Sequence, residues 1–118
     1  MSTKLNFGRD VQGYNAYAPM PSQNKFSAAI TAAGNATFQL PTSAPYWIVN
    51  FSFEPGSDMW VAYGAFGVTA SAPAGATFAS TTSELLPAQR TLVGGSYVNI
   101  YNNGTDTMDV GAVLYAQP

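Results

Sequence analysis

The stretch YWIVNFSF, residues 46–53, decides the fold class of this chain. Its large apolar side chains fall on every second position, which is the period of a β-strand and not that of a helix. One face of the strand then carries Trp47, Val49, Phe51 and Phe53. The opposite face carries Tyr46, Ile48, Asn50 and Ser52. The stretch therefore predicts a strand with one face in a hydrophobic core.

Short apolar runs on both sides of this stretch predict further strands. They occupy residues 26–31, 36–40, 59–66, 75–80, 95–102 and 108–116. The segments 32–35 (AAGN) and 102–106 (NNGTD) are hairpin signals, and 54–58 (EPGSD) is a turn signal. A single helical turn is predicted at 81–89, where Pro87 would end it. Seven or eight strands in succession predict an antiparallel sandwich or barrel.

Alternation on three of the predicted strands identifies the core of this fold. The residues expected to be buried are Trp47, Val49, Phe51, Val98, Ile100, Val110, Ala112 and Leu114. Tyr97 and Tyr101 fall on the face opposite this core, so we expect them to form an exposed contact face for a sugar or a subunit. The sequence thus predicts an all-β protein with an antiparallel β-sandwich at residues 25–118.

Residues 1–24 precede the sandwich and follow neither the helical nor the strand period. Prolines at 19 and 21 favour extended backbone, so we expect an extended N-terminal arm. Its expected contact residues are three aromatic side chains and an arginine: Phe7, Arg9, Tyr14 and Tyr17. Such residues are common anchors of protein interfaces, so the arm is predicted to dock on a neighbouring subunit or partner. Packing of the arm on its own sandwich is the alternative.

Charged residues make up 8% of the chain, against roughly 25% in an ordinary soluble domain. Disorder does not account for this, because 47% of the residues are hydrophobic. No run approaches the roughly 20 apolar residues of a spanning helix, and the start lacks the apolar core of a signal peptide. We therefore expect no membrane partner. A surface of uncharged polar residues suits a protein locked into a large assembly, and an ordinary polar surface is the alternative.

The sequence offers little for catalysis or for cofactor binding. It has neither cysteine nor histidine, which removes thiol nucleophiles, thiolate metal sites and the commonest general base. Its basic residues Lys4, Arg9, Lys25 and Arg90 are scattered, so no nucleic-acid partner is expected. We predict a non-enzymatic protein without catalytic residues, cofactor or metal.

Two kinds of oxygen-based site compete with this prediction. Paired carboxylates could serve a glycosidase, and the candidates are Glu54, Asp58, Glu84, Asp106 and Asp109. A calcium site would draw on Asn102, Asn103, Asp106 and Asp109. Carboxylates in turns mostly face solvent and bond to local backbone, so we favour a turn role in both cases.

Two segments resemble small virion structural proteins of tailed bacteriophages: residues 6–19, NFGRDVQGYNAYAP, and residues 73–116, which end in GAVLYA. The resemblance covers most of the chain, as a polar arm followed by a cysteine-free β-domain. It implies a sandwich of jelly-roll type and the function of a capsid decoration, or cement, protein. Proteins of this class form homotrimers on the outer capsid surface and bind the major capsid protein with extended termini. The resemblance carries over no catalytic residue.

Two other functions stay open at this point. The tryptophans and tyrosines of the predicted strands could form a carbohydrate-binding module of a phage fibre or spike, because aromatic faces stack on sugars. A component of the head–tail connector is the other candidate. The mass of the protein in solution and its binding to a glycan array would separate these functions from that of a cement protein.

Overall fold

The computed structural model describes residues 7–9, 15–19 and 21–117, and these residues form strands and no helix. Two short strands come first, β1 (Phe7–Arg9) and β2 (Asn15–Pro19). The later strands are β3 (Asn24–Ile30), β4 (Asn35–Gln39), β5 (Tyr46–Phe53), β6 (Met59–Gly64), β7 (Glu84–Leu85), β8 (Gln89–Val93), β9 (Tyr97–Asn102) and β10 (Met108–Gln117). The prediction of an all-β protein is confirmed.

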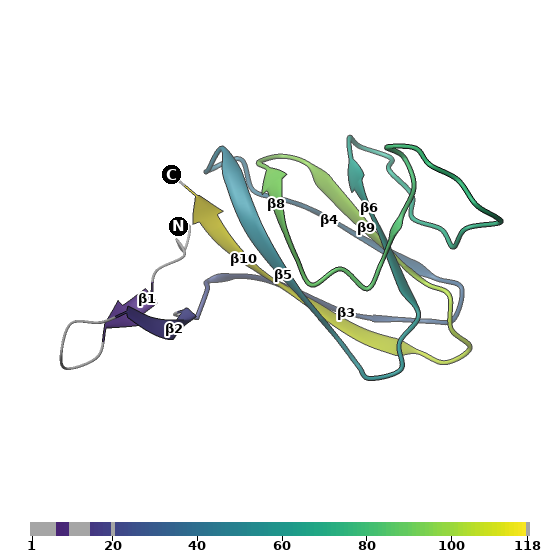
Figure 1. Ribbon diagram of the computed structural model, residues 1–118, viewed down its shortest axis with the longest axis horizontal. Helices are drawn as coiled ribbons and strands as arrows, with labels where there is room; N and C mark the ends of the chain where they lie inside the picture. The colour runs from purple at the N-terminus through teal and green to yellow at the C-terminus, as the bar shows by residue number, and fades with distance from the viewer. Residues whose placement is uncertain (1–6, 10–14, 20, 118) are drawn as a thin grey trace.

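Strands β3 to β10 form two four-stranded antiparallel sheets that pack face to face (Figure 1). The strand orders are β3-β10-β5-β8 and β4-β9-β6-β7. The pairing is nested, because β3 pairs with β10, β4 with β9, β5 with β8 and β6 with β7. Every connection from β3 to β10 except that from β6 to β7 therefore crosses between the sheets. The predicted antiparallel β-sandwich is confirmed.

The two predicted hairpins are wrong. The strands that flank residues 32–35, β3 and β4, belong to different sheets, and so do β9 and β10, which flank 102–106. The turn residues do reverse the chain, but each strand has an apolar face to cover, and crossing to the facing sheet covers it. Asn102 ties the two turns together, because its Nδ2 donates to the Ile30 carbonyl at 2.9 Å and to the Asp106 carbonyl at 2.8 Å.

The core lies between the two sheets. All the predicted core residues are buried there: Trp47, Val49, Phe51, Val98, Ile100, Val110, Ala112 and Leu114. The core also holds Ile30, Leu40, Met59, Val61 and Met108. Trp47 Nε1 donates to the Pro41 carbonyl at 2.9 Å, so its burial leaves no unpaired donor. Burying one large side chain of this kind contributes about 1.5–3 kcal/mol.

Two predictions for the region between β6 and β8 are wrong. Residues 75–80 form no strand and lie in an irregular segment, 65–83. Phe78 is the one large apolar residue of GATFAS, so this run has no alternating face to bury. The helical turn predicted at 81–89 is replaced by β7, the positive φ of Leu86 (46°) and the start of β8. Pairing of β7 with β6 and of β8 with β5 outweighs one isolated helical turn, whose nucleation is unfavourable.

Strands β1 and β2 form a separate antiparallel pair, with Phe7 opposite Pro19. The prediction that the arm lacks strand structure is therefore wrong at these strands. Figure 1 shows the pair to one side of the sandwich, near the end of β10. Ser22 is buried, and its hydroxyl donates to the Leu114 carbonyl of β10. The chain thus enters the sandwich slightly before the predicted residue 25.

Candidate functional site

Carboxylates gather in the turns at one end of the sandwich. Glu54 Oε1 accepts the backbone N–H of Asp109 at 2.8 Å. Asp58 accepts Trp60 Nε1 at 2.9 Å and Asn103 Nδ2 at 2.8 Å. These bonds join neighbouring turns, which is the role expected of turn carboxylates. Within the described ranges, no group of three or more His, Cys, Asp or Glu residues could hold a metal ion.

The asparagine suggested as a calcium ligand is engaged inside its own turn. Asn102 is buried, and its Oδ1 accepts the backbone N–H of Gly104 at 2.9 Å. Its Nδ2 donates to the carbonyl groups of Ile30 and Asp106 in the turns at this end of the sandwich. Asn103 in turn donates to Asp58. These amides shape the turns, and their hydrogen bonds to the backbone and to Asp58 indicate a structural role.

A bidentate ion pair joins β7 and β8, which lie at the same edge of the sandwich in different sheets. Arg90 Nη2 donates to Glu84 Oε2 at 2.6 Å, and Arg90 Nε donates to Glu84 Oε1 at 3.2 Å. The register places both side chains on inner faces, opposite Val49 and Val61. The hydrogen bond from Arg90 holds the pKa of Glu84 below its ordinary value. Burial, and then the nearby Glu84 carboxylate, raises the pKa of Tyr63.

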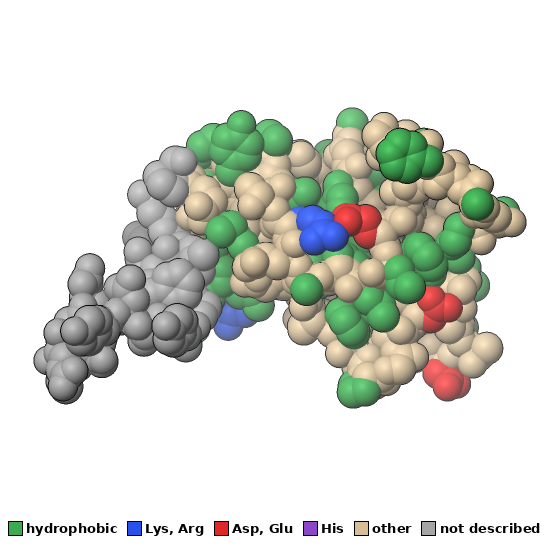
Figure 2. Space-filling model, viewed as in Figure 1, with side chains coloured by type: hydrophobic (Ala, Val, Ile, Leu, Met, Phe, Trp, Pro, Cys, Tyr) green, Lys and Arg blue, Asp and Glu red, His purple; other side chains and the backbone are tan. Residues whose placement is uncertain are grey.

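The irregular segment 65–83 between β6 and β7 contains no charged residue. Its two phenylalanines stand in solvent, Phe66 with 85% and Phe78 with 106% of its surface exposed. Figure 1 shows the segment at the end of the molecule opposite β1 and β2, and Figure 2 shows isolated hydrophobic side chains standing out from a largely uncharged surface there. Docking a phenylalanine ring from water onto an apolar surface lowers the free energy of the system.

Asn99 fixes the base of this segment to the outer face of the β4-β9-β6-β7 sheet. Its Oδ1 accepts the backbone N–H of Ala70 at 2.7 Å and Asn35 Nδ2 at 2.7 Å. Its Nδ2 donates to Thr37 Oγ1 at 2.7 Å. The sequence places Asn99 on the outer face but gives it no role. That role arises only because residue 70, distant along the chain, crosses this face.

The two predicted contact tyrosines lie on the same outer face, half buried, on either side of Asn99. The ring of Tyr97 meets that of Phe66 edge to face, with centroids 5.4 Å apart. Tyr101 lies opposite Trp60 of β6. The structure therefore brings Tyr97 to the segment 65–83, a contact that the sequence does not predict. It brings Tyr101 to Trp60, another of the strand aromatics suggested for a sugar-binding face.

The predicted contact residues of the arm fall on or between β1 and β2. Phe7 and Arg9 belong to β1, and Tyr17 belongs to β2. The antiparallel pairing brings these two strands side by side. Tyr14 lies outside the described residues. For Phe7, Arg9 and Tyr17 only the backbone is described. The docking role of the arm stays a prediction.

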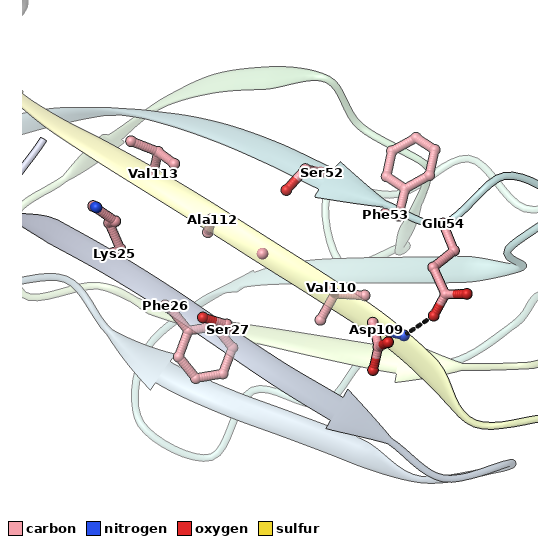
Figure 3. A pocket seen from close by; sticks show the side chains of 11 residues that line it. Lys25, Phe26, Ser27, Ser52, Phe53, Glu54, Asp109, Val110, Ala112 and Val113 are labelled. Carbon is pink, nitrogen blue, oxygen red and sulfur yellow. Dashed lines mark hydrogen bonds between the residues drawn. The ribbon is translucent and has the colours of Figure 1, made fainter. Parts of the chain in front are cut away.

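A hollow of about 460 Å³ opens on the outer face of β3, β10 and β5 (Figure 3). Gly111 forms its floor, opposite Ser27 of β3 and Ser52 of β5. A Cβ atom at position 111 would lie 2.8 Å from Ser52 Oγ, so the glycine keeps the hollow open. Figure 3 shows Lys25 and Val113 at one end, and Phe53, Glu54 and Asp109 at the other.

No protein-family model, curated protein or solved structure matches this chain. The functional argument therefore depends on the geometry of the described residues. Those residues include no helix long and apolar enough to cross a membrane. Two features stand out as contact surfaces: the uncharged segment 65–83 with its exposed phenylalanines, and the hollow over Gly111.

Proposed function

We propose that this chain is a non-enzymatic structural protein of a virion, and specifically a capsid decoration protein. In this role it binds the major capsid protein on the outer capsid surface and stabilises the contacts between capsomers. The observation that carries the proposal is the segment 65–83, which is free of charge and holds Phe78 wholly exposed. The resemblance to small virion proteins of tailed bacteriophages supports the same conclusion.

The order of the strands supports a jelly-roll fold, which recurs in capsid proteins. The nested pairing of β3 with β10 through to β6 with β7 describes one long antiparallel ribbon. Additional pairing of β5 with β10 and of β6 with β9 rolls that ribbon into two facing sheets. This arrangement of eight strands in two facing sheets supports the proposal of a jelly-roll fold.

The chemistry of the exposed segment suits permanent attachment. A contact made by uncharged residues desolvates no charge, so little of the gain from burying the rings is lost. Burying Phe78 would contribute about 1.5–3 kcal/mol. A homotrimer would present the ring in three copies and multiply the affinity. The arm residues Phe7, Arg9, Tyr14 and Tyr17 are proposed as a second attachment at the other end of the molecule.

The experiment is a binding assay with capsids assembled without this chain. We expect the full chain to cosediment with such capsids, and the variant Phe78→Ser to bind about 10- to 100-fold more weakly, which is the affinity equivalent of burying one ring. The melting temperature of the variant should be unchanged, because the ring contacts nothing in the fold. A full chain that does not bind capsids at all would contradict the proposal.

A carbohydrate-binding module is the second candidate function. Trp60 and Tyr101 lie side by side on the outer face of the β4-β9-β6-β7 sheet. Asp58 accepts the indole N–H of Trp60 and also a hydrogen bond from Asn103. Aromatic faces beside carboxylate and amide groups suit the recognition of a sugar. A glycan array separates the two candidates, because binding that is lost in Trp60→Ala and kept in Phe78→Ser would favour the sugar-binding function.

A further inference from the structure

The turn between β9 and β10 carries the one Asn-Gly pair of the sequence, Asn103-Gly104. An asparagine followed by glycine deamidates more readily than other asparagines, because glycine has no side chain to hinder the approach of its backbone nitrogen to the asparagine amide. Asn103 is exposed to solvent, and Gly104 is half-buried. The proposed function gives this reactive pair no role.

Both groups that would react are engaged in hydrogen bonds. The side-chain Nδ2 of Asn103 donates to Asp58 Oδ2 at 2.8 Å, and the backbone N–H of Asn103 donates to the Asp58 carbonyl at 2.9 Å. The backbone N–H of Gly104 donates to Asn102 Oδ1 at 2.9 Å. The attacking nitrogen must give up its proton, so the reaction has to break the bond to Asn102 first.

We propose that Asn103 is a site of spontaneous deamidation whose rate the fold controls. The bonds to Asp58 and Asn102 keep the amide intact while the turn 102–106 is closed, and local opening of this turn releases the reacting groups. The inference does not depend on the proposed function. It adds a chemical role, protection of a reactive peptide bond, to two residues that otherwise shape the turns.

The reaction needs water and no other reagent. The Gly104 nitrogen attacks Cγ of Asn103 and forms a five-membered succinimide ring, while the bond from Cγ to Nδ2 breaks and Nδ2 leaves as ammonia with the proton of the attacking nitrogen. Water then adds to one of the two ring carbonyls and opens the ring, which gives aspartate or isoaspartate at position 103. A polar hollow of about 270 Å³ between the two turns, lined by Asp58 and Gly104, admits this water.

The product would loosen this end of the sandwich. A carboxylate at position 103 has no N–H to donate to Asp58, and it places a second negative charge beside the first, so the two groups repel each other. Asp58 Oδ1 also accepts the indole N–H of Trp60 at 2.9 Å. The disturbance would therefore reach the aromatic pair of Trp60 and Tyr101 on the outer face.

Comparison of the folded and the unfolded chain tests the protection directly, with no substitution. The full chain is incubated at mildly alkaline pH with and without denaturing urea, and mass spectrometry of the tryptic peptide 91–118 locates the amide that is lost. We expect deamidation at Asn103 to be at least about 10-fold slower in the folded chain, because the reaction there requires local opening. Equal rates in the two states would overturn the proposal.

Removal of the protecting carboxylate provides a second test. Asp58→Ala should speed deamidation of the folded chain by about 2- to 10-fold, which is the factor that corresponds to the loss of one ordinary hydrogen bond. Asp106→Ala is the matched control, because it removes an exposed carboxylate of the same turn that takes part in neither protecting bond. The control should keep the native rate. A native rate in folded Asp58→Ala would overturn the proposal.

Variants that imitate the product test its effect on the fold. Asn103→Asp and Asn103→Ala both lose the donor to Asp58, but only the first adds a charge. We expect Asn103→Asp to have the lower melting temperature, and the difference to shrink with added salt, which screens the repulsion. The double variant Asp58→Asn with Asn103→Asp exchanges donor and acceptor and should recover most of the loss. Equal melting temperatures for the two single variants would overturn the proposed loosening.

Discussion

Strand β5 and the segment 65–83 both carry phenylalanines, and they place them in opposite surroundings. Phe51 of β5 is 9% exposed, whereas Phe78 is 106% exposed. Strand β5 pairs with β10 on one side and β8 on the other, so its alternate side chains are directed into the core. The segment 65–83 forms no strand. It is tied to the sheet through Ala70, which bonds to Asn99 and Asn35, and through the contact of Phe66 with Tyr97. Strand pairing, and not apolar character alone, decides which rings form the core and which stay free to bind.

The largest loss of stability should come from removing a core side chain of β5. We expect Trp47→Ala to lower the free energy of unfolding by about 3–5 kcal/mol, because it removes a wholly buried side chain and leaves a cavity. Urea denaturation followed by circular dichroism measures the loss. Trp60→Ala, the same change on an outer face, is the control and should cost clearly less. Equal losses would mean that β5 is not the centre of the core.

A smaller effect should come from releasing the segment 65–83. We expect Asn99→Ala to cost about 1–3 kcal/mol, because the buried N–H of Ala70 loses its acceptor. Amide hydrogen exchange at Ala70 should also become faster, while exchange in β5 keeps its rate. Asn50→Ala, which removes a half-buried asparagine bonded to Gln89, is the control and should change little. Unchanged protection of Ala70 would contradict the anchoring role of Asn99.

A still smaller effect should follow from opening the edge between β7 and β8. Glu84→Gln removes the charge that pairs with Arg90, and we expect it to cost about 0.2–1 kcal/mol, because the pair is more than one-third exposed and is screened by water and salt.

The pH dependence of this pair has a defined sign. The pKa of Glu84 is lowered in the folded chain, so the stabilisation is fully present above the ordinary carboxylate pKa and is lost as the pH falls through the lowered value. Thermal melts from neutral to acidic pH should show the difference between the native chain and Glu84→Gln disappearing at acidic pH. A difference that stays constant with pH would contradict this account.

The smallest effect on stability should come from the ring that the fold leaves in water. We expect Phe78→Ser to change the free energy of unfolding by less than about 0.5 kcal/mol, as surface substitutions commonly do. The same variant should bind capsids about 10- to 100-fold more weakly, whereas the core variants should keep their binding for as long as they stay folded. Melting and sedimentation of one sample measure both properties. A large drop in stability would show that Phe78 contributes to the fold.

The sequence predicts the regularly paired part of the fold well, because the information there is local. Alternation in 46–53 is enough to identify Trp47 and Val49 as core, and the same pattern identifies Val98 and Ile100. The turn signals also mark where the chain reverses. They do not tell which sheet the next strand joins, because that choice depends on covering apolar faces that come from distant parts of the chain.

The candidate site is less predictable for the same reason. Tyr97 and Tyr101 were placed on the outer face from alternation alone, and the register agrees. The sequence does not predict the exposure of Phe78, because GATFAS has the apolar content of a short strand. The hollow over Gly111 depends on Ser27 and Ser52, which lie far apart in sequence and meet only across β10. No periodicity or motif in the sequence predicts that these two residues lie on either side of Gly111.

The nested pairing has a consequence for how this protein is made. Strand β10 is synthesised last, yet it lies between β3 and β5, and its pairing with β3 joins residues 108–114 to residues 24–30. Contacts so distant along the chain slow folding, and here they cannot form until β10 has been synthesised. Gly111 lies on this same strand, so an unfinished chain lacks the hollow. A chain that stops before β10 would thus leave β3 without its partner strand.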